Sequence, residues 1–184
     1  GIPGNQWSNT AVAPQDGEAY WRTRVGFAWL LGLPGAPLMY YGDEYGQWGG
    51  ADPNNRLFWR DEASLNADEK ATLTFLRKMG TARRNIAALQ RGDYVTLSAQ
   101  EDTLVFGRRI SLGNAAIVAI SKSATPQQVT VDGAALGFSA AKPLKDALGG
   151  PDVAVSGVGK VTFTIPARSA VVPPASGPGT VSAV

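Results

Sequence analysis

The stretch that decides the fold runs from Pro34 to Arg56 and reads PGAPLMYYGDEYGQWGGADPNNR. Its first part, Ala36 to Tyr41, is apolar and aromatic without a polar position. A strand with one wet face alternates apolar and polar residues, whereas an unbroken apolar run is typical of a strand buried on both faces in a parallel sheet. A polar, glycine-rich loop begins at Gly42. Because ligands of parallel α/β folds gather beyond the carboxyl ends of the strands, the sequence predicts a buried strand that leads into a binding loop.

A helix is predicted directly before this strand, from about Glu18 to Leu31, with Asp16 as its N-cap. We expect it to be heavily buried, with only Arg22 and Arg24 marking a face in water. The residues expected in the core are Trp21, Val25, Phe27, Ala28, Trp29, Leu30 and Leu31. A helix followed by a buried strand is the second half of a βαβ crossover. The first half is absent and the residues before Asp16 carry no start signal, so we expect the true N-terminus to lie upstream.

A second helix is predicted after the loop, from about Ala67 to Gln90. Asn66 is suited to the N-cap position, and Gly92 closes the helix. The apolar residues of this segment recur at steps of four and three, which places them on one helical face. They are Phe75, Met79, Ala82, Ile86 and Leu89.

From Asp93 the sequence changes to short strands separated by turn residues. The predicted strands are Tyr94 to Ser98, Thr103 to Arg109, Ala115 to Ser121, Gln128 to Val131, Val153 to Ser156, Lys160 to Ile165 and Ser169 to Val172. Regular turn signals between them favour an antiparallel sandwich. We therefore divide the chain into residues 1–92, residues 93–173 and a Pro/Gly/Ser/Ala-rich tail at 174–184, which we expect to be a flexible end or a linker.

Composition excludes several classes of function. The 184 residues include 44% hydrophobic and 17% charged residues, as in a folded globular protein, and the net charge is only +2. Neither nucleic acid nor a membrane is therefore expected as a partner. The chain has no cysteine, which excludes disulfides and thiolate metal sites. The cellular compartment stays open.

The same stretch carries a resemblance to a known family. Its first block has Gly35, Pro37, Tyr40, Tyr41, Gly42 and Glu44, and its second is Gly49-Gly50-x-Asp52-Pro53-Asn54-Asn55-Arg56. In this order and spacing the two blocks resemble the last barrel strand of glycoside hydrolase family 13, the α-amylase family. The resemblance implies a fold of the α/β plus all-β class. In that architecture the chain would contain the C-terminal segment of a (β/α)8 TIM barrel, followed by an antiparallel Greek-key β-sandwich.

The resemblance also implies where catalysis takes place. Retaining glycosidases need two carboxyl groups about 5 Å apart, and in this family they lie on earlier strands, upstream of Gly1. The chain has no histidine, so the family's Asn-His-Asp signature is absent. We expect the chain alone to be inactive and to hold no cofactor, while calcium stays possible in the missing part. Asp43 and Glu44 point to different sides as strand-end neighbours, so we expect one to support the loop and the other to be solvated.

Three residues are candidates for sugar binding: Asp52, Arg56 and Trp48. The resemblance implies that Asp52 and Arg56 hydrogen-bond glucose units, and carboxylate and guanidinium groups suit sugar hydroxyls. Alternatively, Asp52 caps a short helix that begins at Pro53, with Arg56 merely paired to it. Trp48 can offer its indole face to a pyranose ring or instead pack under its own loop.

The function implied is that of the C-terminal piece of an α-glucan-acting glycosidase that works by retaining double displacement. Its partners would be starch or maltooligosaccharides and the missing N-terminal barrel portion. Two alternatives stay open from the residues: a non-catalytic module that binds starch or glycogen, and a structural piece without sugar affinity. Within the family, an α-1,6-glucosidase or a glucanotransferase is also compatible with the sequence.

Overall fold

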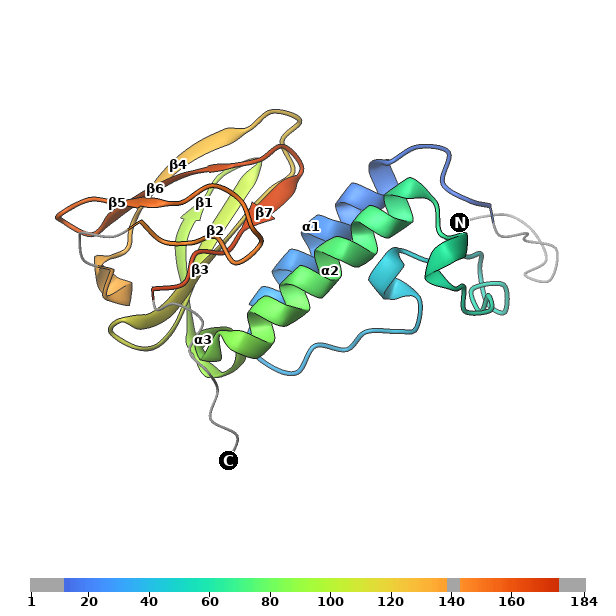
Figure 1. Cartoon of the computed structure of the whole chain (residues 1–184), viewed down its shortest axis with the longest axis horizontal. Helices are drawn as coiled ribbons and strands as arrows, with labels where there is room; N and C mark the ends of the chain where they lie inside the picture. Colours follow the sequence, from blue (N-terminus) through green and yellow to red (C-terminus); the bar gives the residue numbers. More distant parts are fainter. Residues whose placement is uncertain (1–11, 139–142, 176–184) are drawn as a thin grey trace.

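The computed structural model describes residues 12–138 and 143–175. In Figure 1 the helices lie at one end of the molecule and the strands at the other. The helical part contains α1 (Glu18–Gly32), α2 (Ala67–Asn85) and α3 (Ala87–Arg91), with short 3-10 turns at Asp43–Tyr45 and Glu62–Ser64. The predicted tail falls outside the described residues from position 176 onward. Ala175 at its start donates its N–H to the carbonyl of Ala115 in the sandwich.

Helix α1 confirms the first predicted helix, but its cap and its burial differ from expectation. The N-cap is Gly17 and not Asp16. Asp16 precedes the N-cap, and its carboxylate accepts the N–H of Glu18 at 2.9 Å. Ala28 and Leu31 are buried, whereas Trp29 is 46% exposed. The prediction of a heavily buried helix is wrong for this chain, because α2 and the sandwich cover only part of the helix surface.

The second predicted helix is divided in two. Helix α2 ends at Asn85, Ile86 adopts extended angles (φ −107°, ψ 99°), and α3 follows. Gln90 Nε2 donates to the carbonyls of Arg83 and Arg84. These carbonyls belong to the last turn of α2 and would otherwise lack hydrogen-bond donors within the helix. The apolar face is confirmed, since Met79, Ala82, Ile86 and Leu89 are buried and Phe75 packs against them. The spacing of that face continues through the break and therefore could not reveal it.

The apolar segment, residues 36–41, has no regular secondary structure from 36 to 40, ends in a turn at Tyr41, and forms no strand with any other described residue. Leu38 is 88% exposed and Tyr40 54%. The prediction of a strand buried on both faces is therefore wrong for this chain by itself. A strand needs neighbouring backbone for its hydrogen bonds, and none of the described strands lies beside this segment.

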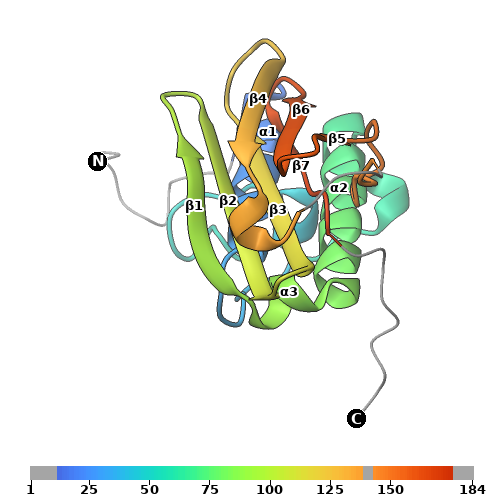
Figure 2. The same ribbon diagram turned by 90° about the vertical axis from the view of Figure 1, so that its left-hand side faces the viewer.

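All seven predicted strands are present in the C-terminal part. They are β1 (Asp93–Ala99), β2 (Thr103–Ser111), β3 (Asn114–Ser121), β4 (Gln127–Asp132), β5 (Ala154–Val155), β6 (Lys160–Ile165) and β7 (Ser169–Val171). The four-stranded sheet has the order β1-β2-β3-β7 and the three-stranded sheet β4-β6-β5, with antiparallel pairing throughout. The chain leaves the first sheet after β3 and returns beside β3 as β7. This arrangement confirms the antiparallel sandwich, whose two sheets Figure 2 shows face to face.

The four-stranded sheet is a central layer with a hydrophobic core on each face. On one face, Phe106, Val118 and Ala170 pack against the three helices. On the other face, alternate residues such as Val105 and Ile117 pack against the three-stranded sheet. The molecule thus has three layers, namely helices, sheet and sheet. The boundary predicted at residues 92 and 93 stays a prediction, and the first core is shared by residues on both sides of it.

Candidate carbohydrate-binding loop

The loop after Tyr41 is shaped by two glycines with positive φ and by two backbone-bonded carboxylates. Gly42 has φ 90° and a Cβ there would lie 2.7 Å from Gln47 Cβ, so only glycine fits the turn. Asp43 Oδ2 accepts the N–H of Tyr40 at 2.8 Å, and Glu44 Oε2 accepts the N–H of Gly42 at 2.9 Å. The expectation that only one of the two supports the loop is wrong, because both do. The two carboxylates fix the loop backbone rather than facing one bond together.

Asp52 and Arg56 lie together at the end of the loop. Their side chains form an ion pair at 2.8 Å and are 70% and 55% exposed. Residue 51 lies in a bend and residues 52–55 form a turn rather than a helix. The N–H of Asn54 donates to the carbonyl of Ala51 at 2.7 Å. The pairing of Arg56 with Asp52 is thus present, whereas the short helix in the alternative interpretation is not; sugar binding by the pair stays a prediction.

Trp48 faces a different part of the molecule. It lines a groove of about 520 Å³ between the loop and α1, together with Phe27, Trp29 and Leu30, whereas neither Asp52 nor Arg56 lines it. Trp48 is half-buried there. The structure therefore brings two of the three predicted residues together and places the third in a neighbouring groove.

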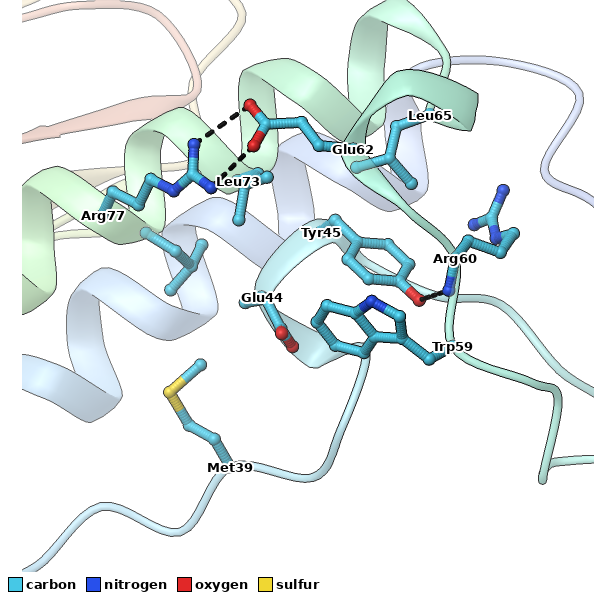
Figure 3. Close-up of a pocket in the computed structure, with 10 residues that line it drawn as sticks. Met39, Glu44, Tyr45, Trp59, Arg60, Glu62, Leu65, Leu73 and Arg77 are labelled. Atoms are coloured by element: carbon cyan, nitrogen blue, oxygen red, sulfur yellow. Dashed lines mark hydrogen bonds and ion pairs between the residues drawn. The ribbon is translucent and has the colours of Figure 1, made fainter.

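A further hollow of about 370 Å³ lies between the loop and α2. Figure 3 shows Tyr45 and Trp59 next to each other, with Met39 and, on α2, Leu73 to one side of them. The two rings meet edge to face with centroids 5.2 Å apart. The Tyr45 hydroxyl accepts the N–H of Arg60 at 3.2 Å and also bonds the Gln47 side chain. These contacts join both ends of the loop.

An ion pair between the half-buried Arg60 and the buried Glu69 anchors the segment that follows the loop, residues 57–65, to α2. Glu69 is 1% exposed, and its carboxylate accepts hydrogen bonds from Nη2 and Nη1 of Arg60 at 2.5 and 3.2 Å. It also accepts the N–H of Asn66 and, at 3.4 Å, the Tyr20 hydroxyl. Burial alone would raise the pKa of the Glu69 carboxyl, but the hydrogen bonds from Arg60 and Asn66 and the charge of Arg60 lower it on balance.

Sequence reasoning missed this anchor, although part of its signal was present. Asn66-x-x-Glu69 has the spacing of a capping box, and the structure contains both reciprocal bonds. That spacing assigns Glu69 to the helix start. Its pairing with Arg60 depends on the path of residues 57–65, which have no periodic pattern.

Comparisons of the sequence and the structure with those of known proteins indicate the class of protein to which the chain belongs. No family model matches the chain. An amylopullulanase of Thermoanaerobacterium saccharolyticum is 36% identical over 153 residues, covering 77% of this chain and 11% of that protein. A Nostoc punctiforme debranching enzyme superposes with a TM-score of 0.70 at 29% identity, covering 91% of this chain and 34% of the other. An Anoxybacillus α-amylase gives 0.70 at 28% identity, covering 85% and 33%. The class of protein that these relatives and structures define is the glycoside hydrolases.

More specifically, the chain belongs to glycoside hydrolase family 13, the α-amylase family. The chain spans about a tenth of the length of the amylopullulanase that it matches. In the part of the chain that the structure describes, no cluster of three His, Cys, Asp or Glu residues is arranged to hold a metal ion. No helix within the same residues is long and apolar enough to cross a membrane.

Proposed function

We propose that the chain is the C-terminal part of an α-glucan-acting glycosidase, in which it completes the catalytic barrel and adds a stabilising β-sandwich. The exposed apolar segment Ala36–Tyr41 carries this proposal. Four consecutive large apolar side chains, from Leu38 to Tyr41, are 37–88% exposed, and Phe58 from residues 57–65 is 94% exposed. A contiguous exposed apolar patch marks an interaction surface. Covering Leu38 or Phe58 would contribute about 1.5–3 kcal/mol each. A partner sheet and helices from a preceding barrel portion would supply both this burial and the missing backbone hydrogen bonds.

The reaction would be retaining double displacement on an α-glucan such as starch, with the two catalytic carboxyl groups supplied by the preceding portion. The names of related proteins, such as amylopullulanase and cyclomaltodextrin glucanotransferase, support an α-glucan substrate. They differ in reaction, so the proposal does not extend to the bond cleaved or to hydrolysis over transfer. Alone, the chain would be inactive.

Within this enzyme, Asp52, Arg56 and Trp48 would contact sugar. The exposed ion pair supports this role, because Asp52 holds the guanidinium in one orientation while both groups keep hydrogen-bonding capacity towards solvent. Trp48 would offer an aromatic surface in the adjacent groove.

Recombination of separately produced parts tests the main proposal. Mixing this chain with the N-terminal portion of the same enzyme should restore hydrolysis of soluble starch, while each part alone stays inactive. Leu38→Asp should reduce the recovered activity strongly, because it places a charge in the segment that the N-terminal portion would bury. Val158→Asp is the matched control, since Val158 is 75% exposed on the sandwich. Full recovery with Leu38→Asp, or none with the natural sequence, would contradict the proposal.

Arg56→Ala in the full-length enzyme tests the sugar contacts. Loss of a hydrogen bond from a charged group costs about 1.5–3 kcal/mol of binding, so KM for maltooligosaccharides should rise about tenfold or more. Stability should fall by less than ~1 kcal/mol, because the pair with Asp52 is exposed. Arg22→Ala is the control, since it removes another exposed i,i+4 pair, with Glu18. Unchanged KM and kcat in Arg56→Ala would remove this site assignment.

A further inference from the structure

Arg108 of β2 is a completely buried arginine whose hydrogen-bond partners are backbone carbonyls. It is 0% exposed. Its Nη1 donates to the carbonyls of Gly32 at 2.6 Å and Leu89 at 3.0 Å. Its Nε and Nη2 donate to the carbonyl of Gly92 at 3.0 and 2.7 Å. One side chain of the sandwich thus binds the carbonyl of the last residue of α1, a carbonyl within α3 and the carbonyl of the residue that follows α3.

Arg83 of α2 approaches the same point from the helical side. Its Nη1 donates to the carbonyls of Leu31, Leu33 and Leu89 at 2.6, 3.0 and 2.8 Å, and its Nη2 to that of Gly35 at 2.6 Å. Both arginines therefore bond Leu89. Together they bind four of the five carbonyls from residue 31 to residue 35, where the chain leaves α1 for the apolar segment.

Two adjacent guanidinium groups need compensation for their charge. Burial lowers the pKa of both arginines, and for Arg108 the nearby charge of Arg83 lowers it further. Neither is paired with a carboxylate among the described residues. The unsatisfied carbonyls at a helix C-terminus carry partial negative charge and stabilise cations. The ends of α1 and α3 provide such carbonyls, and Figure 1 shows α3 at the junction between helices and sandwich.

The fork geometry explains why arginine occupies both positions. A guanidinium group has five donors in a rigid plane and can serve several carbonyls at once, whereas an ammonium group is a single point charge on a flexible stem. Arg108→Lys would keep the charge but leave part of this carbonyl set without donors.

We propose that Arg83 and Arg108 are positioning residues that fix where the chain leaves α1 and hence where the segment from Gly32 to Arg56 lies. The sandwich, through Arg108, then helps to place the loop that carries Asp52 and Arg56. The link to sugar rests on the proposed function, whereas the placement of the backbone does not.

Hydrogen exchange on the full-length protein tests the placement. In Arg108→Lys, amide exchange across residues 33–47 should accelerate at least tenfold, while β3 and β6 keep their protection. Arg109→Lys is the matched control, because Arg109 is the next residue of β2 and its guanidinium donates to the carbonyl of Ala135, within the sandwich part, at 2.5 Å. Unchanged exchange at 33–47, or equal acceleration everywhere, would overturn the proposal. Arg83→Lys, on the partly exposed partner, gives the same readout if Arg108→Lys does not fold.

A double-mutant cycle tests the link to the loop. Arg108→Lys should raise KM for maltooligosaccharides several-fold, and its effect should largely disappear in the presence of Arg56→Ala, because both act on the same contacts. Fully additive effects would show that the two arginines do not act through Arg56 and would overturn the link. If Arg56→Ala alone leaves KM unchanged, the sugar assignment fails, and the exchange experiment still decides whether Arg83 and Arg108 position the backbone.

Discussion

The substitution Gly32→Ala, at the last residue of α1, tests how tightly the helices pack on the sandwich. A Cβ at this position would lie 2.8 Å from Phe106 Cζ and 3.1 Å from Val118 Cγ1. Carbon atoms in contact prefer about 3.5–4.0 Å. Phe106 and Val118 are both fully buried, so neither ring nor methyl can move outward. Gly32→Ala must therefore push the end of α1 away from the central sheet.

Two opposing effects determine the sign of the change in stability. Alanine is favoured over glycine inside a helix by about 1 kcal/mol, and by less at the last residue. Overpacking of a close-packed core costs about 1–3 kcal/mol. The displacement also lengthens the bond from Arg108 to the Gly32 carbonyl, now 2.6 Å. We expect Gly32→Ala to lower the free energy of unfolding by about 1–2 kcal/mol.

Urea denaturation with far-UV circular dichroism measures this difference. Gly26→Ala is the matched control, because a Cβ at Gly26 in the same helix meets nothing within 4 Å. That variant should be as stable as the natural sequence or more stable by up to about 1 kcal/mol. If Gly32→Ala were stabilised like Gly26→Ala, the close contact between α1 and the sandwich would be refuted.

The start of α2 provides two further predictions. Asn66→Ala removes the capping box and should cost about 1 kcal/mol of unfolding free energy, whereas Asn66→Asp should be nearly neutral; thermal denaturation of both measures it, and equal stability of the two would contradict the role of the cap. Glu69→Gln should destabilise the protein by about 1–3 kcal/mol near neutral pH, because Arg60 loses its charged acceptor. Because the pKa of Glu69 is lowered in the folded state, the stability it contributes is present above the unfolded pKa and is lost as the pH falls through the folded value. The difference in unfolding free energy between the natural sequence and Glu69→Gln should therefore become smaller at acidic pH. A difference independent of pH would contradict this account.

The sequence alone determined most of the local structure. The short strand segments and the regular turn residues between them predicted all seven strands to within two residues at each end, because these signals lie within single segments. The periodic face of α2 and the position of Asn66 were likewise readable, and the two blocks from Gly35 to Arg56 indicated the family.

The tertiary structure decided which surfaces these elements share. The break at Ile86, the burial of the central sheet on both faces and the two arginines on one carbonyl cluster depend on contacts between segments far apart in the chain. The same reason explains the segment Ala36–Tyr41. Its composition specifies a strand for a buried environment, but a strand exists only where neighbouring backbone receives its hydrogen bonds, and within the described residues that neighbour is absent.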